Sequence, residues 1–261
     1  MATAALGLSA SRMSVGRVFE RAFATVRQNP LVTILFAFFF AALPNLGLAV
    51  VIAAMDTGDT DPPISTSAIQ MLVMFTLTAL VVSLAQAAQT PAVLAFREGR
   101  RGTISQGLSM LVRAIVPVVI LGLLSGASIF LGCVLLIVPG LFLWVVWSVS
   151  VPTLVAERLG ILASLRRSAQ LTKKARWQVL AVLLLVASAN IGVSIGVEVF
   201  TGEFQNDDSW AGLFDPTYLA ATLIADIILS SVAGAINASL YVELRDWKEG
   251  PGIDNLEDVF A

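Results

Sequence analysis

The residue with the clearest chemical potential is Asp226, a carboxyl group inside a long apolar stretch. It lies about eight residues after Tyr218, or roughly 12 Å along a helix. None of the apolar stretches offers a Lys or Arg to neutralise it, and an ionisable residue inside a membrane is a functional candidate by default. Two interpretations stay open. Asp226 belongs to a polar path or proton-linked site, or it is a protonated carboxyl that hydrogen-bonds to a neighbouring helix.

Other polar residues recur at helical spacing in separate apolar stretches. Asn190, Ser194 and Glu198 are four residues apart, and Gln86 belongs to a similar stripe. Such stripes either line a cavity or hydrogen-bond between packed helices. The candidates for an intramembrane polar site are Asp226, Asn190, Ser194, Gln86 and Asn237.

The inventory of catalytic groups is short. The 261 residues include no His and a single Cys, Cys133, which lies in an apolar stretch. This excludes a His base, a His-paired nucleophile and a His metal ligand. We therefore predict no catalytic residue, no metal site and no cofactor, and an intramembrane enzyme is the least favoured function.

The composition is that of a membrane protein. Hydrophobic residues make up 57% of the chain and charged residues 13%, and the mean hydropathy is +0.86. These values exclude a disordered chain, a disulfide-rich domain and an ordinary soluble enzyme. Six apolar stretches stand out, most of them near the roughly 20 residues that a membrane helix needs. They are 31–55, 68–96, 115–138, 141–156, 179–200 and 218–242.

We predict an all-α fold, a polytopic membrane helix bundle of six transmembrane helices arranged as three hairpins. Amphipathic patterns predict interfacial helices over 14–28 and 161–177, and a weaker one over 103–113 with Thr103 as its N-cap. The Val138-Pro139-Gly140 segment predicts the turn between the third and fourth spans. Residues 1–261 form one membrane domain, comprising an N-terminal amphipathic helix (1–30), the bundle (31–242) and an acidic tail (243–261).

Charge distribution predicts the orientation. All 16 Lys and Arg residues fall in connections on one side, and the connections on the other side carry acidic residues. By the positive-inside rule both termini are cytoplasmic. One basic segment is a candidate for contact with anionic lipid headgroups, although its charges could merely set the topology. Its residues are Arg166, Arg167, Lys173, Lys174 and Arg176.

Two pairs of glycines are spaced for close helix packing. They are Gly122 with Gly126 and Gly192 with Gly196. Small residues four apart let helices approach closely, either within one chain or between two copies. A homo-oligomer through one of these pairs is therefore a possible assembly, and nothing in the sequence suggests a nucleic-acid partner.

Several segments together resemble a known family. They are Val138-Pro139-Gly140 running into Trp144 and Trp147, then Pro152 and Val155-Ala156-Glu157, then 163–168, 171–173 and Trp177, together with Gly16-Arg17-Val18-Phe19 and Asn29-Pro30 near the N-terminus. This pattern is similar to the YciC-like six-helix bacterial membrane proteins and to the membrane domain fused to some glycerophosphoryl diester phosphodiesterases. The resemblance implies the fold and an association with phospholipid biology. It does not imply phosphodiesterase activity, because that chemistry belongs to a separate soluble domain that uses His.

The leading functional hypothesis is a non-enzymatic inner-membrane protein that contacts or organises phospholipids, as a scaffold for an envelope process. The alternative is a transporter or channel for a small solute or lipid, with Asp226 as its intramembrane acid.

Overall fold

The computed structural model describes residues 13–48, 64–202 and 216–250, which form helices joined by short links, with no strand among them. Six segments are long and apolar enough to span a membrane. They are Pro30–Leu48, Ser67–Arg97, Ile104–Leu135, Ile137–Glu157, Arg176–Thr201 and Pro216–Glu249. The predicted all-α multi-pass bundle is confirmed. The predicted acidic connections and the tail beyond residue 250 lie outside the described residues.

The N-terminal helices follow the predicted amphipathic pattern. Helix α1 (Val15–Gln28) buries Val18 and Ala22 against the end of α10. Helix α2 (Pro30–Ala37) starts at Pro30 and continues into the π-helical segment η1 (Phe38–Ala42). Pro44 follows closely, and because it lacks an N–H it cannot bond to the carbonyl of Phe40 four residues earlier. A local change of helix register at this place is the usual accommodation.

Helices α4 (Ile64–Arg97) and α5 (Ile104–Leu135) form a closely packed pair. A Cβ placed on Gly122 would lie 3.1 Å from the Leu80 Cα, and one on Gly126 would lie 2.7 Å from the Ala79 Cβ. The Gly122/Gly126 pair is thus occupied by packing within the chain, which removes it as a surface for a second copy.

The start of α5 differs from the prediction. Residues 103–113 do not form a separate interfacial helix, because α5 runs without interruption from Ile104 to Leu135. The Thr103 N-cap is found, in a capping box with Gln106. No Gly or helix-breaking link separates Arg113 from Ile115, so the amphipathic turns simply extend the span.

The hairpin between the third and fourth spans is also tighter than predicted. Helix α6 (Ile137–Trp147) begins one residue after Leu136, so Pro139 and Gly140 lie in its first turn rather than in the connection. A Cβ on Gly140 would lie 2.2 Å from the Cys133 sulfur, so only glycine allows this approach. The fourth span is then interrupted before α7 (Ser150–Glu157). In a regular helix the ring of Pro152 would clash with the carbonyl of Ser148 four residues earlier.

The second predicted interfacial helix is shorter than expected. Helix α8 (Ile161–Thr172) ends before Lys174, which adopts a positive φ of 75°, and α9 (Arg176–Thr201) follows at once. The buried face of α8 includes Ser164 and Ser168, whereas the apolar Leu162 is 65% exposed. Both serine hydroxyls donate to backbone carbonyls, which allows them to be buried at little cost.

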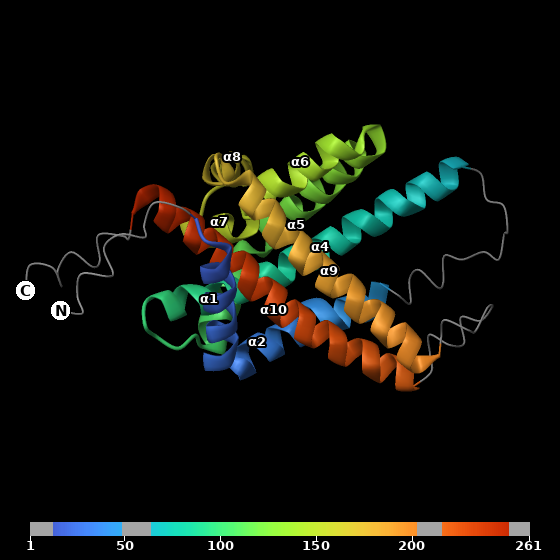
Figure 1. Ribbon diagram of the computed structural model, residues 1–261, viewed down its shortest axis with the longest axis horizontal. Coiled ribbons are helices and arrows are strands. Elements are labelled where there is room, and N and C mark those ends of the chain that lie inside the picture. Colours follow the sequence, from blue (N-terminus) through green and yellow to red (C-terminus); the bar gives the residue numbers. More distant parts are fainter. Residues whose placement is uncertain (1–12, 49–63, 203–215, 251–261) are drawn as a thin grey trace, which may run out of the picture.

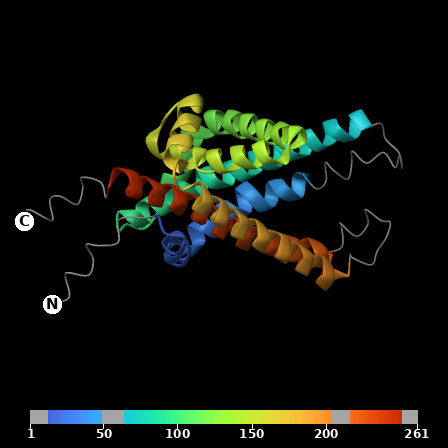
Figure 2. The same ribbon diagram turned by 45° about the horizontal axis from the view of Figure 1, so that its top comes forward.

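The bundle is tightly packed at one end and divergent at the other. The final helix, α10 (Pro216–Glu249), meets α1, α8 and the end of α4 at what we call the charged end. Away from it, the α9–α10 pair separates from α4 and the α5–α6 hairpin (Figures 1 and 2). Burial follows this arrangement, since no described residue of α9 beyond Leu183, or of α10 before Ser231, is buried.

Candidate functional site

A cavity of about 400 Å³ lies where the helices begin to diverge. Each of the six candidate spans contributes to its wall, from Asn45 in the first to Asn237 in the last. Many of the lining side chains are apolar or aromatic, including Phe75, Trp144 and Trp147. A mostly apolar cavity of this size with a few polar groups is the usual form of a small-molecule site.

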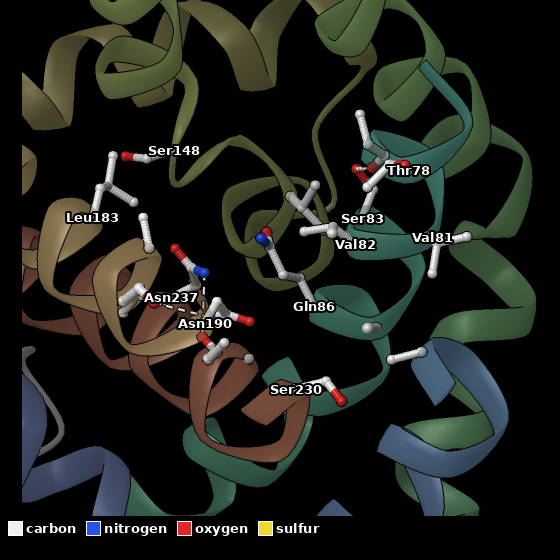
Figure 3. A pocket seen from close by; sticks show the side chains of 18 of the residues that line it. Thr78, Val81, Val82, Ser83, Gln86, Ser148, Leu183, Asn190, Ser230 and Asn237 are labelled. Carbon is white, nitrogen blue, oxygen red and sulfur yellow. Dashed lines mark hydrogen bonds between the residues drawn. The ribbon is translucent and has the colours of Figure 1, made fainter. Parts of the chain in front are cut away.

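The cavity brings together most of the polar residues singled out in the sequence. Gln86 on α4 points across it toward Asn190 on α9 and Asn237 on α10 (Figure 3), and Asp226 also lines it. Ser194 does not, because it is exposed on the surface of α9. Gln86, Asn190, Asp226 and Asn237, which lie on three helices and up to 151 residues apart in the chain, therefore meet at one site.

The contacts of Asp226 are few. The side-chain amide of Asn45 donates to its carboxylate at 3.5 Å, and the Ser230 hydroxyl donates to its backbone carbonyl. Both partners also line the cavity. Among the described residues no cation lies within ion-pair distance of Asp226.

Other features of the site were not predicted. Asn45 was overlooked because it stands alone beside Pro44 with no repeating polar partner. Trp144 and Trp147 both line the cavity. Their spacing of three residues, which places them on one helix face, was visible in the sequence.

The cavity is closed toward the charged end by tightly packed residues. About one helical turn beyond it lie Gln89, Thr153 and Tyr241, none of which is exposed. The Tyr241 hydroxyl donates to the Glu157 carboxylate at 2.9 Å. The amide nitrogen of Gln89 donates to the Ser230 carbonyl at 3.0 Å. This layer ties α4, α7 and α10 together beneath the cavity.

An ion-pair network joins the elements of the charged end. Glu243 on α10 accepts hydrogen bonds from the Arg17 guanidinium at 2.5 and 2.8 Å and lies 3.9 Å from Arg21. Asp246 pairs with Arg97 at 2.6 Å and with Arg21 at 3.7 Å. The predicted acidic tail therefore begins inside α10, and its first carboxylates anchor α1 and α4.

The basic segment divides into two parts. Arg167 pairs with Glu157 at 3.0 Å and with Glu249, so its guanidinium is held within the chain. Partial burial opposes its charge, but the two carboxylates outweigh this effect and the pKa of Arg167 is raised above its ordinary value. The other members, Arg166, Lys173, Lys174 and Arg176, are exposed. None of these four has a carboxylate within ion-pair distance in the described part of the chain.

The remaining candidate features are simple to place. Gly192 and Gly196 lie on an open face of α9, where an added Cβ would meet nothing within 4 Å. Among the described residues, no three side chains able to ligate a metal come together.

Comparison with family models, curated proteins and solved structures finds no match to this chain. The resemblance to the YciC-like group stays a prediction.

Proposed function

We propose that this protein is a non-enzymatic membrane transporter that binds a small solute or a lipid group in the cavity and moves it across the bilayer. The main support for this proposal is that Gln86, Asn190, Asn237 and Asp226 line one cavity between the spans. Polar groups inside a membrane are costly unless they pair with one another or face a cavity. Here they face a cavity walled by apolar side chains, which is the arrangement that a transported ligand requires.

The chemistry of the site supports binding rather than catalysis. The serines that line the cavity donate their hydroxyl protons to backbone carbonyls, not to a side-chain base. An activated nucleophile needs such a base within hydrogen-bond distance. Asp226 contacts an amide rather than a serine hydroxyl.

The test compares molecules retained by two variants of α9. Ala187 lines the cavity, whereas Ala189 is exposed two residues away. Protein extracted directly into polymer nanodiscs is analysed by native mass spectrometry. Ala187→Leu should fill part of the cavity and lose a molecule that the wild type and Ala189→Leu keep. Proteoliposomes loaded with that molecule should then release it faster than protein-free vesicles, and Asp226→Asn should slow the release. Identical retention in all three proteins would contradict the proposal.

A second candidate function is contact with anionic phospholipids at the charged end. The observation that favours it is the exposed group of Arg166, Lys173, Lys174 and Arg176, beside Trp177, which is 82% exposed. Basic residues near an anionic membrane surface contribute about 1 kcal/mol each, and Trp is favoured at the interface. By the positive-inside rule this end faces the cytoplasm, and the resemblance to the YciC-like group favours a bacterial inner membrane.

The phospholipid proposal has its own test. Lipids retained in native nanodiscs are compared with the bulk membrane for the wild type and for a variant with Gln at these four positions. The matched control replaces Arg100 and Arg101, exposed basic residues in another link at the same end. Enrichment of anionic lipid should be lost in the first variant and kept in the control. A wild-type lipid profile equal to the bulk membrane would overturn this function.

A further inference from the structure

We propose that the cavity selects a primary ammonium group carried on an apolar or aromatic body. This inference rests on the proposed function and names the chemical class of its ligand. It depends on three properties of the wall, namely several uncommitted hydrogen-bond acceptors, one carboxyl group without a cationic partner, and aromatic side chains in the same lining.

The polar side chains of the wall offer several uncommitted hydrogen-bond acceptors. The serine hydroxyls of the wall are all committed as donors to backbone carbonyls, so their oxygens offer only lone pairs to a ligand. These serines are Ser83, Ser125, Ser148, Ser150 and Ser230. Asn190 and Asn237 likewise donate to their own helices, at 2.8 and 3.2 Å, which leaves both side-chain oxygens free to accept. A ligand with several N–H donors can therefore bond to more than one of these oxygens at once.

A further acceptor without a donor lies in the packed layer beneath the cavity, outside its lining. The Gln89 side-chain oxygen is buried and has no hydrogen-bond donor among the described residues. It lies directly beside Gly234, where an added Cβ would be 2.4 Å away, and Gly234 lines the cavity. The lining also carries neutral donors with no acceptor among the described residues, namely the Gln86 amide, the Thr78 hydroxyl and the indole N–H groups of Trp144 and Trp147. None of these donors brings a positive charge to Asp226.

The charge of the wall has a single sign. Asp226 is acidic, and none of the described lining residues is basic. Its contact with Asn45 is 3.5 Å long and brings no positive charge. A carboxylate within a membrane span needs a counterion, and a bound ammonium group would supply it. An anionic ligand would instead meet a like charge without compensation.

The aromatic residues complete the match. Phe75, Trp144 and Trp147 enter the wall from α4 and α6. Tryptophan faces attract cations and also pack against apolar groups. A primary ammonium with three N–H donors therefore fits the polar groups, and its apolar body fits the remainder of the cavity. The same group is found on free amphipathic amines and on the headgroup of an aminophospholipid.

Binding of tritiated 2-phenylethylamine to the purified full-length protein in nanodiscs tests the inference. Three competitors keep the aromatic body and change the head. They are 2-phenylethanol, which is neutral, 3-phenylpropionate, which is anionic, and trimethyl(2-phenylethyl)ammonium, which keeps the charge but has no N–H donor. Nanodiscs without protein correct for partitioning into lipid.

The proposal predicts the relative affinities of the four probes. 2-Phenylethylamine should bind at least about tenfold more tightly than each competitor, the usual size of a charge-assisted hydrogen bond. Asp226→Asn should remove most of that preference, and Ala189→Leu should leave it unchanged. Nanodiscs containing phosphatidylethanolamine should weaken the binding relative to phosphatidylglycerol if the headgroup is the natural source. Equal binding in both lipids would point to a free amine, and both outcomes support the inference.

Other results would overturn the ammonium class. Tighter binding of the neutral or anionic probe, or an undiminished preference in Asp226→Asn, would exclude it. If Ala187→Leu abolished the binding of the neutral or anionic probe, the cavity would remain the binding site, and only the proposed selectivity for ammonium groups would be wrong. Absence of binding by all four probes would also reject the ammonium class. The retained-molecule comparison, which uses no amine, would then decide the proposed function separately.

Discussion

Replacing Glu243 with Gln should weaken the attachment of α1 to the bundle. The Glu243 side chain is only 4% exposed and accepts from the Arg17 guanidinium and from the Ser14 backbone N–H at 3.3 Å. Hydrogen bonds to a charged group contribute about 1.5–3 kcal/mol each. Arg17 is 40% exposed and can be rehydrated, and the new amide oxygen still accepts one bond, so these effects reduce the loss. We therefore expect the opening free energy of α1 to fall by about 2 kcal/mol.

Hydrogen exchange measures this change directly. A fall of about 2 kcal/mol corresponds to roughly 30-fold faster exchange of the protected amides of α1, such as Val18 and Ala22, when exchange follows local opening. The matched control is Glu98→Gln, because Glu98 and Arg100 form an ion pair in which both side chains are more than half exposed. That pair should contribute less than about 1 kcal/mol, with no effect on α1. Unchanged α1 exchange in Glu243→Gln would refute the view that the ion pairs anchor this helix.

Three further substitutions test the packing and capping of the bundle. Gly140→Ala would drive a methyl group into α5 and should lower the free energy of unfolding, measured by denaturant titration in detergent, by about 1–3 kcal/mol. Gly192→Ala, on the open face of α9, should cause no loss. Tyr241→Phe leaves Glu157 without its buried donor and should cost about 1–3 kcal/mol in the same titration; an unchanged midpoint would show that this bond adds nothing. Thr103→Ala removes the capping box and should destabilise the first turn of α5 by about 1 kcal/mol, measured as faster exchange there, and exchange equal to that of the wild type would count against the cap.

The spans were predictable because the need to bury backbone polar groups in lipid leaves few alternatives to long apolar helices. The boundaries were harder. The turn at Leu136 depends on the approach of Gly140 to Cys133, and only the folded hairpin shows that this leaves no room for a longer link. The end of α8 was misplaced because Lys173 and Lys174 continue the amphipathic pattern, although Lys174 adopts a left-handed conformation.

The site was partly predictable for a different reason. Helical spacing identified Gln86, Asn190 and Asn237 as polar residues within spans, but spacing along one helix does not determine which neighbour that helix faces. Ser194 continues the Asn190 stripe and yet lies where α9 has separated from the bundle. Arg167 was predicted to face lipid, and it is instead paired with Glu157 and Glu249, the second of which is 82 residues away.

Helix α10 links the charged end to the cavity. It carries Asp226 and Asn237 at the cavity, and further along it carries Glu243 and Asp246, which pair with α1 and α4. Each residue advances a helix by about 100°, so a rotation of α10 by a single position would turn Asp226 away from the cavity. Carboxylates on α10 that engage arginines on separate helices oppose such a rotation, and the close packing of Gly234 on Gln89 opposes a slide along the axis. The ion pairs at the charged end therefore influence the cavity indirectly, because they fix the orientation of α10, which carries Asp226.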